Sequence, residues 1–135
     1  MIFLDTSCIY ALADRNDQMH AQAVSAFDTA RAANEEVVTH SYVLIESAAL
    51  LQRRLGLRAS LAFLQDAANF TVTWVDEDLH SRAVAHLQQS NLPGVSLVDA
   101  VSFLLMRDQG ITRYLGFDGH FDNAGFTRYP TPGQP

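Results

Sequence analysis

Four acidic residues lie in the most apolar stretches of this 135-residue chain: Asp5, Glu46, Asp99 and Asp118. Each follows or lies among aliphatic and aromatic residues, where an unpaired carboxylate is strongly disfavoured. A buried acid must therefore take up a proton, pair with a cation or bind a metal ion. Four such acids in one small protein indicate that they share a cation.

Each acid also has an ordinary structural explanation when it is taken alone. Asp5 and Asp99 are good helix N-caps or first-turn residues, and Ser96 with Asp99 fits a capping box. Asp118 suits a turn, and Glu46 could lie on a solvated helix face. If all four acids had only structural roles, their common placement at strand ends and helix starts would require four independent coincidences. We therefore favour a single shared site.

Clustered carboxylates repel one another, which raises some of their pKa values unless a cation offsets the charge. A set of oxygen ligands without closely spaced His or Cys suits Mg²⁺ or Mn²⁺ better than Zn²⁺. These ions polarise phosphoryl oxygens and lower the pKa of a bound water. The chemistry expected of the site is metal-assisted hydrolysis of a phosphodiester.

The elements that must position these acids alternate between short strands and helices. Strands are predicted at 2–5, 36–39, 71–75, within 111–117 and at 126–129, and helices at 6–13, 17–34, 41–55, 58–69, 77–89 and 96–109. Gly56 and Gly110 are predicted to end two of these helices, and Leu61, Leu64 and Ala68 to share one helix face. This alternation predicts an α/β fold with a short, mainly parallel sheet of about five strands flanked by helices. Ligands bind at the carboxyl ends of such strands, so all four acids can face one cleft.

Composition narrows the classes of function. The net charge of −6 excludes a global basic footprint for nucleic acid but leaves room for local arginine patches. All nine basic residues are Arg, and we favour a GC-rich coding bias as the reason. The lack of Lys excludes P-loop enzymes, which need a Lys to bind phosphate. Cys8 is expected to be a buried thiol in a reducing compartment. With no evident signal peptide or membrane span, we expect one cytoplasmic domain over 1–129 and a flexible tail over 130–135.

The chain resembles the PIN-domain ribonucleases in four acidic motifs, and most of all the VapC-type toxins of bacterial toxin–antitoxin pairs. The motifs are Asp5-Thr6-Ser7, Glu46, Ser96-Leu-Val-Asp99-Ala-Val-Ser-Phe and Phe117-Asp118-Gly-His-Phe-Asp122-Asn-Ala-Gly-Phe126. The last two are the specific ones, and the resemblance extends over nearly the whole chain. It implies a three-layer PIN-like fold and a Mg²⁺- or Mn²⁺-dependent endoribonuclease that is inhibited by a cognate antitoxin protein.

The resemblance also implies roles for individual residues. Asp5 and Asp99 match the main metal ligands of the family, whereas Glu46 and Asp118 match acids that orient water or hold a second ion. Hydrogen bonds from Thr6 or Ser7, and from Ser96, would steady these ligands. A homodimer is also implied. The RNA substrate is either the sarcin–ricin loop of large-subunit ribosomal RNA, which we favour, or a tRNA, and cleavage of either inhibits translation.

Several further residues have two interpretations. Asp122 is either a fifth site acid or, as favoured, a solvated loop residue, and His120 is either a metal ligand or, as favoured, a surface-loop histidine. Arg53, Arg54, Arg58 and Arg107 either contact RNA phosphates or make ordinary surface interactions. Packing or capping roles are expected for His20, His40, His80 and His86, and a core position for Trp74.

The main alternative function is a catalytically silent PIN-like module that binds RNA or protein. Loss of one or more acids is the usual mark of such a module, and all four are present. A signalling receiver domain is disfavoured because it needs adjacent acids near the first strand and a Lys. An aspartyl-phosphate phosphatase would need an acid at position 7, which is Ser7.

Overall fold

A computed structural model describes residues 1–131 of the protein and contains one sheet of parallel strands. The order across the sheet is β3-β2-β1-β4-β5, and all neighbouring pairs run parallel. The strands are β1 (Ile2–Leu4), β2 (Val37–His40), β3 (Thr71–Thr73), β4 (Arg113–Leu115) and β5 (Thr127–Arg128). The expected α/β architecture with a short parallel sheet is confirmed.

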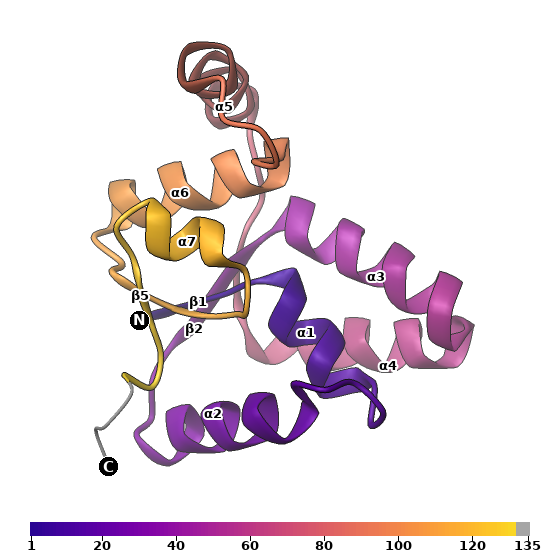
Figure 1. Ribbon diagram of the computed structural model, residues 1–135. Helices are drawn as coiled ribbons and strands as arrows, with labels where there is room; N and C mark the ends of the chain where they lie inside the picture. The colour runs from indigo at the N-terminus through magenta and orange to yellow at the C-terminus, as the bar shows by residue number, and fades with distance from the viewer. Residues whose placement is uncertain (132–135) are drawn as a thin grey trace.

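Helices cover both faces of the sheet and form three layers with it (Figure 1). In that view α6 and α7 lie above the strands, whereas α1, α2 and α4 lie below them. The helices are α1 (Thr6–Ala13), α2 (His20–Ala32), α3 (Ser41–Leu55), α4 (Leu57–Asp66), the 3₁₀ turn η1 (Ala67–Asn69), α5 (Glu77–Ser90), α6 (Leu97–Gln109) and α7 (Gly119–Asn123).

The central strand explains the apolar start of the chain. Ile2, Phe3 and Leu4 are fully buried because β1 pairs on both edges and is covered on both faces. The ring of Phe121 in α7 stacks against the rings of both Phe3 and Tyr114, at centroid distances of 5.9 and 4.7 Å. This aromatic contact fixes α7 against the sheet, which matters for the site described below.

Helix boundaries agree with the sequence where local chemistry sets them. Gly56 and Gly110 end α3 and α6 with φ of +100° and +68°, as expected for residues that tolerate positive φ. His40 caps α3 by accepting a hydrogen bond from the Val43 amide, so its predicted capping role is confirmed. The predicted helix over 17–34 begins only at His20, and the last predicted turn of the helix over 58–69 is η1.

Two predictions are wrong because they depended on packing. Trp74 lies beyond the end of β3 with 72% of its surface exposed, so it is not a core residue. The segment after β4 is the short helix α7 and not a loop. Leu61 and Leu64 of α4 are about half exposed, while Phe63 of the same helix is buried. Residues 132–135 of the predicted tail lie outside the described residues.

Candidate active site

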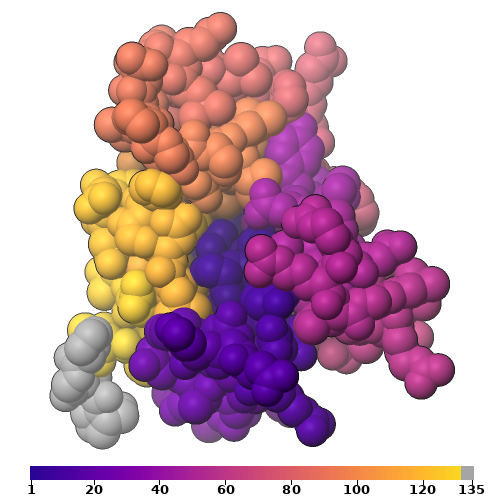
Figure 2. All heavy atoms as spheres, turned by 45° about the vertical axis from the view of Figure 1, so that its right-hand side comes forward, coloured from indigo at the N-terminus to yellow at the C-terminus, as the bar shows by residue number. Residues whose placement is uncertain are grey.

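The acidic site forms where two neighbouring strands end. Asp5 directly follows β1, and Asp118 follows β4 after two intervening residues. Because β1 and β4 pair in parallel, with Leu4 opposite Leu115, both acids lie at the same edge of the sheet. Asp99 enters from the first turn of α6. In Figure 2 the indigo N-terminal segment lies in a recess between α3 (magenta) and the yellow C-terminal segment.

Asp5 is held by a short hydrogen-bond chain that joins the two strand ends. Its Oδ2 accepts hydrogen bonds from the Ser7 amide at 3.2 Å and from Ser7 Oγ at 2.7 Å. Ser7 Oγ in turn accepts a hydrogen bond from the Phe117 amide at 2.9 Å. Gly116 permits this approach, since a Cβ there would lie 3.1 Å from the Asp5 Cβ and 3.2 Å from Ser7 Oγ.

Asp99 is fixed by the capping box that the sequence predicts. Its amide donates to Ser96 Oγ at 3.1 Å, and its Oδ2 accepts from the Ser96 amide at 3.2 Å. Both Asp5 and Asp99 are buried, at 5% and 8% exposure. Ser7 and Ser96 therefore make the expected contacts with the two acids. The Thr6 hydroxyl instead accepts a hydrogen bond from Ser47 Oγ of α3.

Burial and mutual repulsion disfavour the charged forms of these acids. Burial raises the pKa of Asp5 from 3.8 to about 6, the Ser7 hydrogen bonds oppose that rise, and the negative charge of Asp99 adds to it. The pKa of Asp99 is also raised, first by burial and also by the charge of Asp118, while the Ser96 hydrogen bonds and His120 oppose the rise. A bound cation would therefore stabilise the charged forms of both carboxylates.

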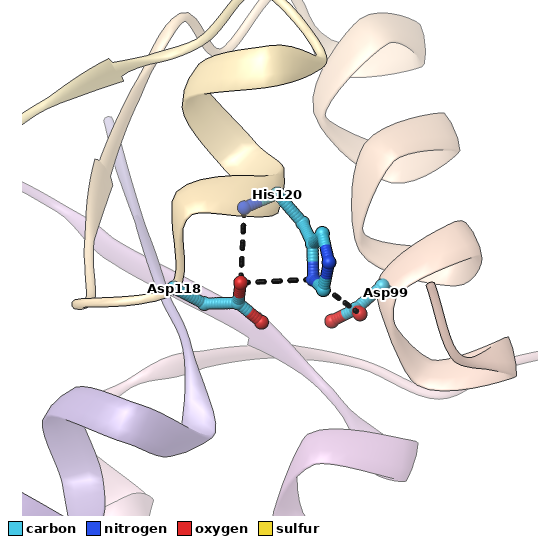
Figure 3. A group of neighbouring side chains, drawn as sticks. All are labelled: Asp99, Asp118 and His120. Atoms are coloured by element: carbon cyan, nitrogen blue, oxygen red, sulfur yellow. Dashed lines mark hydrogen bonds and ion pairs between the residues drawn. The ribbon is translucent and has the colours of Figure 1, made fainter. Parts of the chain in front are cut away.

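His120 lies between Asp99 and Asp118 and is part of the site (Figure 3). Its Nδ1 is 2.9 Å from Asp118 Oδ1 and 3.8 Å from Asp99 Oδ2. One donor atom from each of these three residues lies within 4.8 Å of the others, a spacing that could hold a metal ion. The favoured interpretation of His120 as a surface-loop residue is wrong, because α7 turns its ring toward the acids. The Asp-x-His spacing was the available signal.

Glu46 does not join this close group. It lies on α3 and is exposed, next to the buried Ser47 that contacts Thr6. No hydrogen bond or ion pair links it to the other acids within residues 1–131. Its catalytic role stays a prediction.

Asp122 points to a different neighbour. Its Oδ1 accepts a hydrogen bond from the Tyr114 hydroxyl at 2.8 Å, and its Oδ2 is 4.0 Å from Arg128. The side chain is 52% exposed and stands outside the group of Asp99, Asp118 and His120. This geometry gives Asp122 a structural contact on α7.

The four arginines considered as phosphate contacts are all exposed, and none of them forms an ion pair with a site acid within residues 1–131. Arg53 and Arg54 occupy the last turn of α3, roughly 20 Å along the helix from its start at 1.5 Å per residue. Arg54 stacks over the Tyr10 ring at 5.3 Å. Arg107 donates to the Ala124 carbonyl and lies over Phe126, so it does not pair with a site carboxylate.

Three of the other four histidines have structural partners for their side chains. His80 Nδ1 is 2.6 Å from the Tyr42 hydroxyl, and His20 Nδ1 is 2.7 Å from the Ala11 carbonyl oxygen. His40 Nε2 is 2.9 Å from Ser102 Oγ in the core. In the part of the chain that the structure describes, none of the helices has the length and apolar character needed to cross a membrane.

Comparison with known proteins identifies the family. The family model described as PIN domain matches residues 2–127, which is almost the whole chain. The chain belongs to the PIN domain family. The resemblance found in the acidic motifs is thereby confirmed.

Two curated relatives are similar to this PIN domain over nearly their full length. Both carry the name 23S rRNA-specific endonuclease VapC20 and come from Mycobacterium tuberculosis, strains CDC 1551 / Oshkosh and ATCC 25618 / H37Rv. Each is 37% identical over 128 residues, which cover 93% of this chain and 95% of the relative.

A solved structure agrees with the sequence comparison. The crystal structure of Mycobacterium tuberculosis VapC20, described as a sarcin–ricin loop cleaving toxin, superposes on this PIN domain with a TM-score of 0.84 at 35% identity. The match covers 94% of this chain and 97% of that one, so the three-layer PIN fold is established for this protein.

Proposed function

We propose that this protein is a metal-dependent endoribonuclease that acts as the toxin of a toxin–antitoxin pair and cleaves the sarcin–ricin loop of large-subunit ribosomal RNA. The observation that carries the proposal is the convergence of Asp5, Asp99 and Asp118 at one edge of a PIN-domain sheet. The similarity to VapC20 enzymes supports the choice of ribosomal RNA over tRNA.

The residues present fit a divalent cation. Asp5 and Asp99 are buried carboxylates with raised pKa values, and within residues 1–131 neither of them forms an ion pair with an Arg. We assign Asp99 and Asp118, with Asp5 across the recess, as the acids that hold Mg²⁺ or Mn²⁺. A bound ion would polarise a phosphoryl oxygen and lower the pKa of a bound water.

The chain itself orients the acidic groups. Ser7 fixes Oδ2 of Asp5 by hydrogen bonds from its amide and its hydroxyl. The Ser96 amide likewise fixes Oδ2 of Asp99. We assign Glu46, an exposed residue of α3, to orienting the attacking water or a second ion. The recess holds the scissile phosphate near these groups, while exposed arginines such as Arg53 and Arg58 contact more distant phosphates of a folded RNA.

Protein partners are part of the proposal. The surface of α3 and α4 exposes Ile45, Leu55, Leu57, Leu61 and Leu64, each between 38% and 65%. Apolar side chains gathered in this way mark protein interaction sites more often than free surface. We assign this surface to a homodimer contact and expect a cognate antitoxin to cover the acidic recess, for which an antitoxin Arg would supply complementary charge.

The direct test is cleavage of purified ribosomes in Mg²⁺ or Mn²⁺, followed by mapping of new RNA 5′ ends. Wild type should produce one dominant cut in the sarcin–ricin loop, and Asp99→Asn should lose at least 100-fold in rate while keeping its circular dichroism spectrum. Asp76→Asn, at the exposed N-cap of α5, is the matched control and should cut normally. Equal cleavage by wild type and Asp99→Asn would refute the mechanism.

A catalytically silent PIN-like module is the second candidate. Thermal unfolding with and without Mn²⁺ separates it from the enzyme, because a ligand that binds only the folded state raises the melting temperature with its occupancy. We expect a rise at millimolar Mn²⁺ in wild type and a smaller one in Asp99→Asn. The absence of any rise would favour the silent module.

A further inference from the structure

His120 presents an unpaired nitrogen to the acidic site. Its Nδ1 is buried and has no hydrogen-bond partner, although it lies 2.9 Å from Asp118 Oδ1. The angles at that contact do not suit a hydrogen bond, and the His120 backbone amide already donates to the same oxygen at 2.9 Å. A buried polar atom without a partner is costly, which indicates that a group absent from the protein chain completes it.

The ring is held in this orientation from two sides. The next residue, Phe121, is fully buried and stacks on Tyr114, so α7 has little freedom to turn. On the opposite edge of the ring, a Cβ at Gly94 would lie 3.2 Å from Nε2, so a larger residue there would crowd the imidazole. Nδ1 is therefore directed at the acids and Nε2 at the loop before α6, as Figure 3 shows for Nδ1.

We propose that His120 is a ligand of the metal ion, binding through neutral Nδ1 beside Asp99 and Asp118, and that this nitrogen shifts the site toward Mn²⁺ and away from Mg²⁺. The inference rests on the proposed metal site and adds a ligand to its acids. Donor atoms at right angles around an octahedral ion, each about 2.1 Å from it, are separated by about 3.0 Å. The distance of 2.9 Å from Nδ1 to Asp118 Oδ1 is close to that separation, whereas the distance of 3.8 Å to Asp99 Oδ2 is longer and would shorten on metal binding.

The metal preference follows from ligand chemistry. Mg²⁺ prefers oxygen donors and keeps several of its waters, whereas imidazole nitrogen binds transition metals better. A site of carboxylates alone would discriminate little between Mg²⁺ and Mn²⁺ by ligand type. One imidazole added to two carboxylates gives Mn²⁺ the advantage.

The competing explanation is that His120 acts as a built-in cation. A protonated imidazole between Asp99 and Asp118 would offset their charge and occupy the place of the metal. The two explanations predict opposite effects of removing the ring. A ligand that is removed weakens metal binding, but a competing cation that is removed strengthens it.

The experiment uses the whole purified protein and the metal alone. Electron spin echo envelope modulation of bound Mn²⁺ detects a coordinated ¹⁴N, and Mn²⁺ and Mg²⁺ affinities are measured by calorimetry on the same samples. We expect a ¹⁴N coupling in wild type that is lost in His120→Ala. Mn²⁺ affinity should fall roughly 10- to 100-fold or more in that variant, since even the hydrogen-bond partners of metal ligands contribute this much. Mg²⁺ affinity should fall less.

His86→Ala is the matched control, because His86 lies on α5 and outside the acidic group. It should keep both the ¹⁴N coupling and the affinity. Bound Mn²⁺ without ¹⁴N coupling, or tighter Mn²⁺ binding in His120→Ala, overturns the inference about His120 and leaves the acidic metal site intact. Failure of wild type to bind Mn²⁺ at all overturns the proposed metal site together with it.

Discussion

Replacing Asp5 by Asn should stabilise the metal-free protein at neutral pH. The carboxyl is 5% exposed, and burial raises its pKa from 3.8 to about 6. At pH 7 the wild type must therefore keep a buried charge that folding disfavours. Asn has nearly the same shape, stays neutral and can still accept a hydrogen bond from Ser7 through its Oδ1. The variant removes the charge and keeps the N-cap of α1.

The sign and size of this change in stability follow from the pKa of Asp5 in the unfolded chain and in the folded protein. Between pH 3.8 and about 6 the folded protein binds a proton at Asp5 that the unfolded chain releases, so rising pH destabilises the fold across this window. Each pKa unit corresponds to about 1.4 kcal/mol, which gives roughly 3 kcal/mol for the full effect above pH 6. The free energy of unfolding of Asp5→Asn should be close to that of wild type near pH 4 and should exceed it by roughly 3 kcal/mol at pH 7.

A second buried group acts in the opposite direction over the same range. Burial lowers the pKa of His40 from 6.5 to about 4, so the folded state disfavours its charged form and stability rises with pH through that window. The two contributions largely cancel in wild type. The contribution of the Asp5 carboxyl is therefore measured by the difference in free energy of unfolding between wild type and Asp5→Asn. The variant itself should become more stable from pH 4 to 6.5, because only the contribution of His40 remains.

The assay is equilibrium urea unfolding in EDTA at several pH values from 4 to 7.5, followed by circular dichroism. Asp76→Asn makes the same chemical change at an exposed N-cap and should stay within about 0.5 kcal/mol of wild type throughout. A difference between wild type and Asp5→Asn that is constant with pH, or a less stable variant at pH 7, would show that Asp5 is not a strained buried acid.

Three further outcomes test the structure elsewhere. Ser7→Ala should lower the free energy of unfolding by about 1–3 kcal/mol, because the Phe117 amide loses its acceptor, and unchanged urea midpoints would contradict this. Ser102→Ala should lower the free energy of unfolding by about 1–3 kcal/mol, because it leaves His40 Nε2 unpaired in the core. Urea unfolding measures this change, and an unchanged free energy of unfolding would show that the contact contributes nothing to stability. Iodide should quench the fluorescence of Trp74, the only Trp, almost as efficiently as free indole, whereas strong protection would place it in the core.

Sequence reasoning succeeded where local chemistry determines the outcome. Apolar runs such as Ile2–Leu4 form buried parallel strands, and Gly56 and Gly110 end helices because positive φ suits glycine. Ser96 and Asp99 form a capping box because the partners lie three residues apart in one turn. The four acidic motifs likewise led to the PIN family, which the family model confirms.

Local patterns in the chain place the acids at strand ends and helix starts, and hence indicate the family and the chemistry expected of it. Which of these groups meet depends on the packing of the elements. His120 joins Asp99 and Asp118 because α7 packs through Phe121 onto the sheet, while Trp74 and Leu61 stay exposed because no element of the described chain covers them. Such pairings depend on contacts between residues far apart in the chain, and no local pattern encodes them.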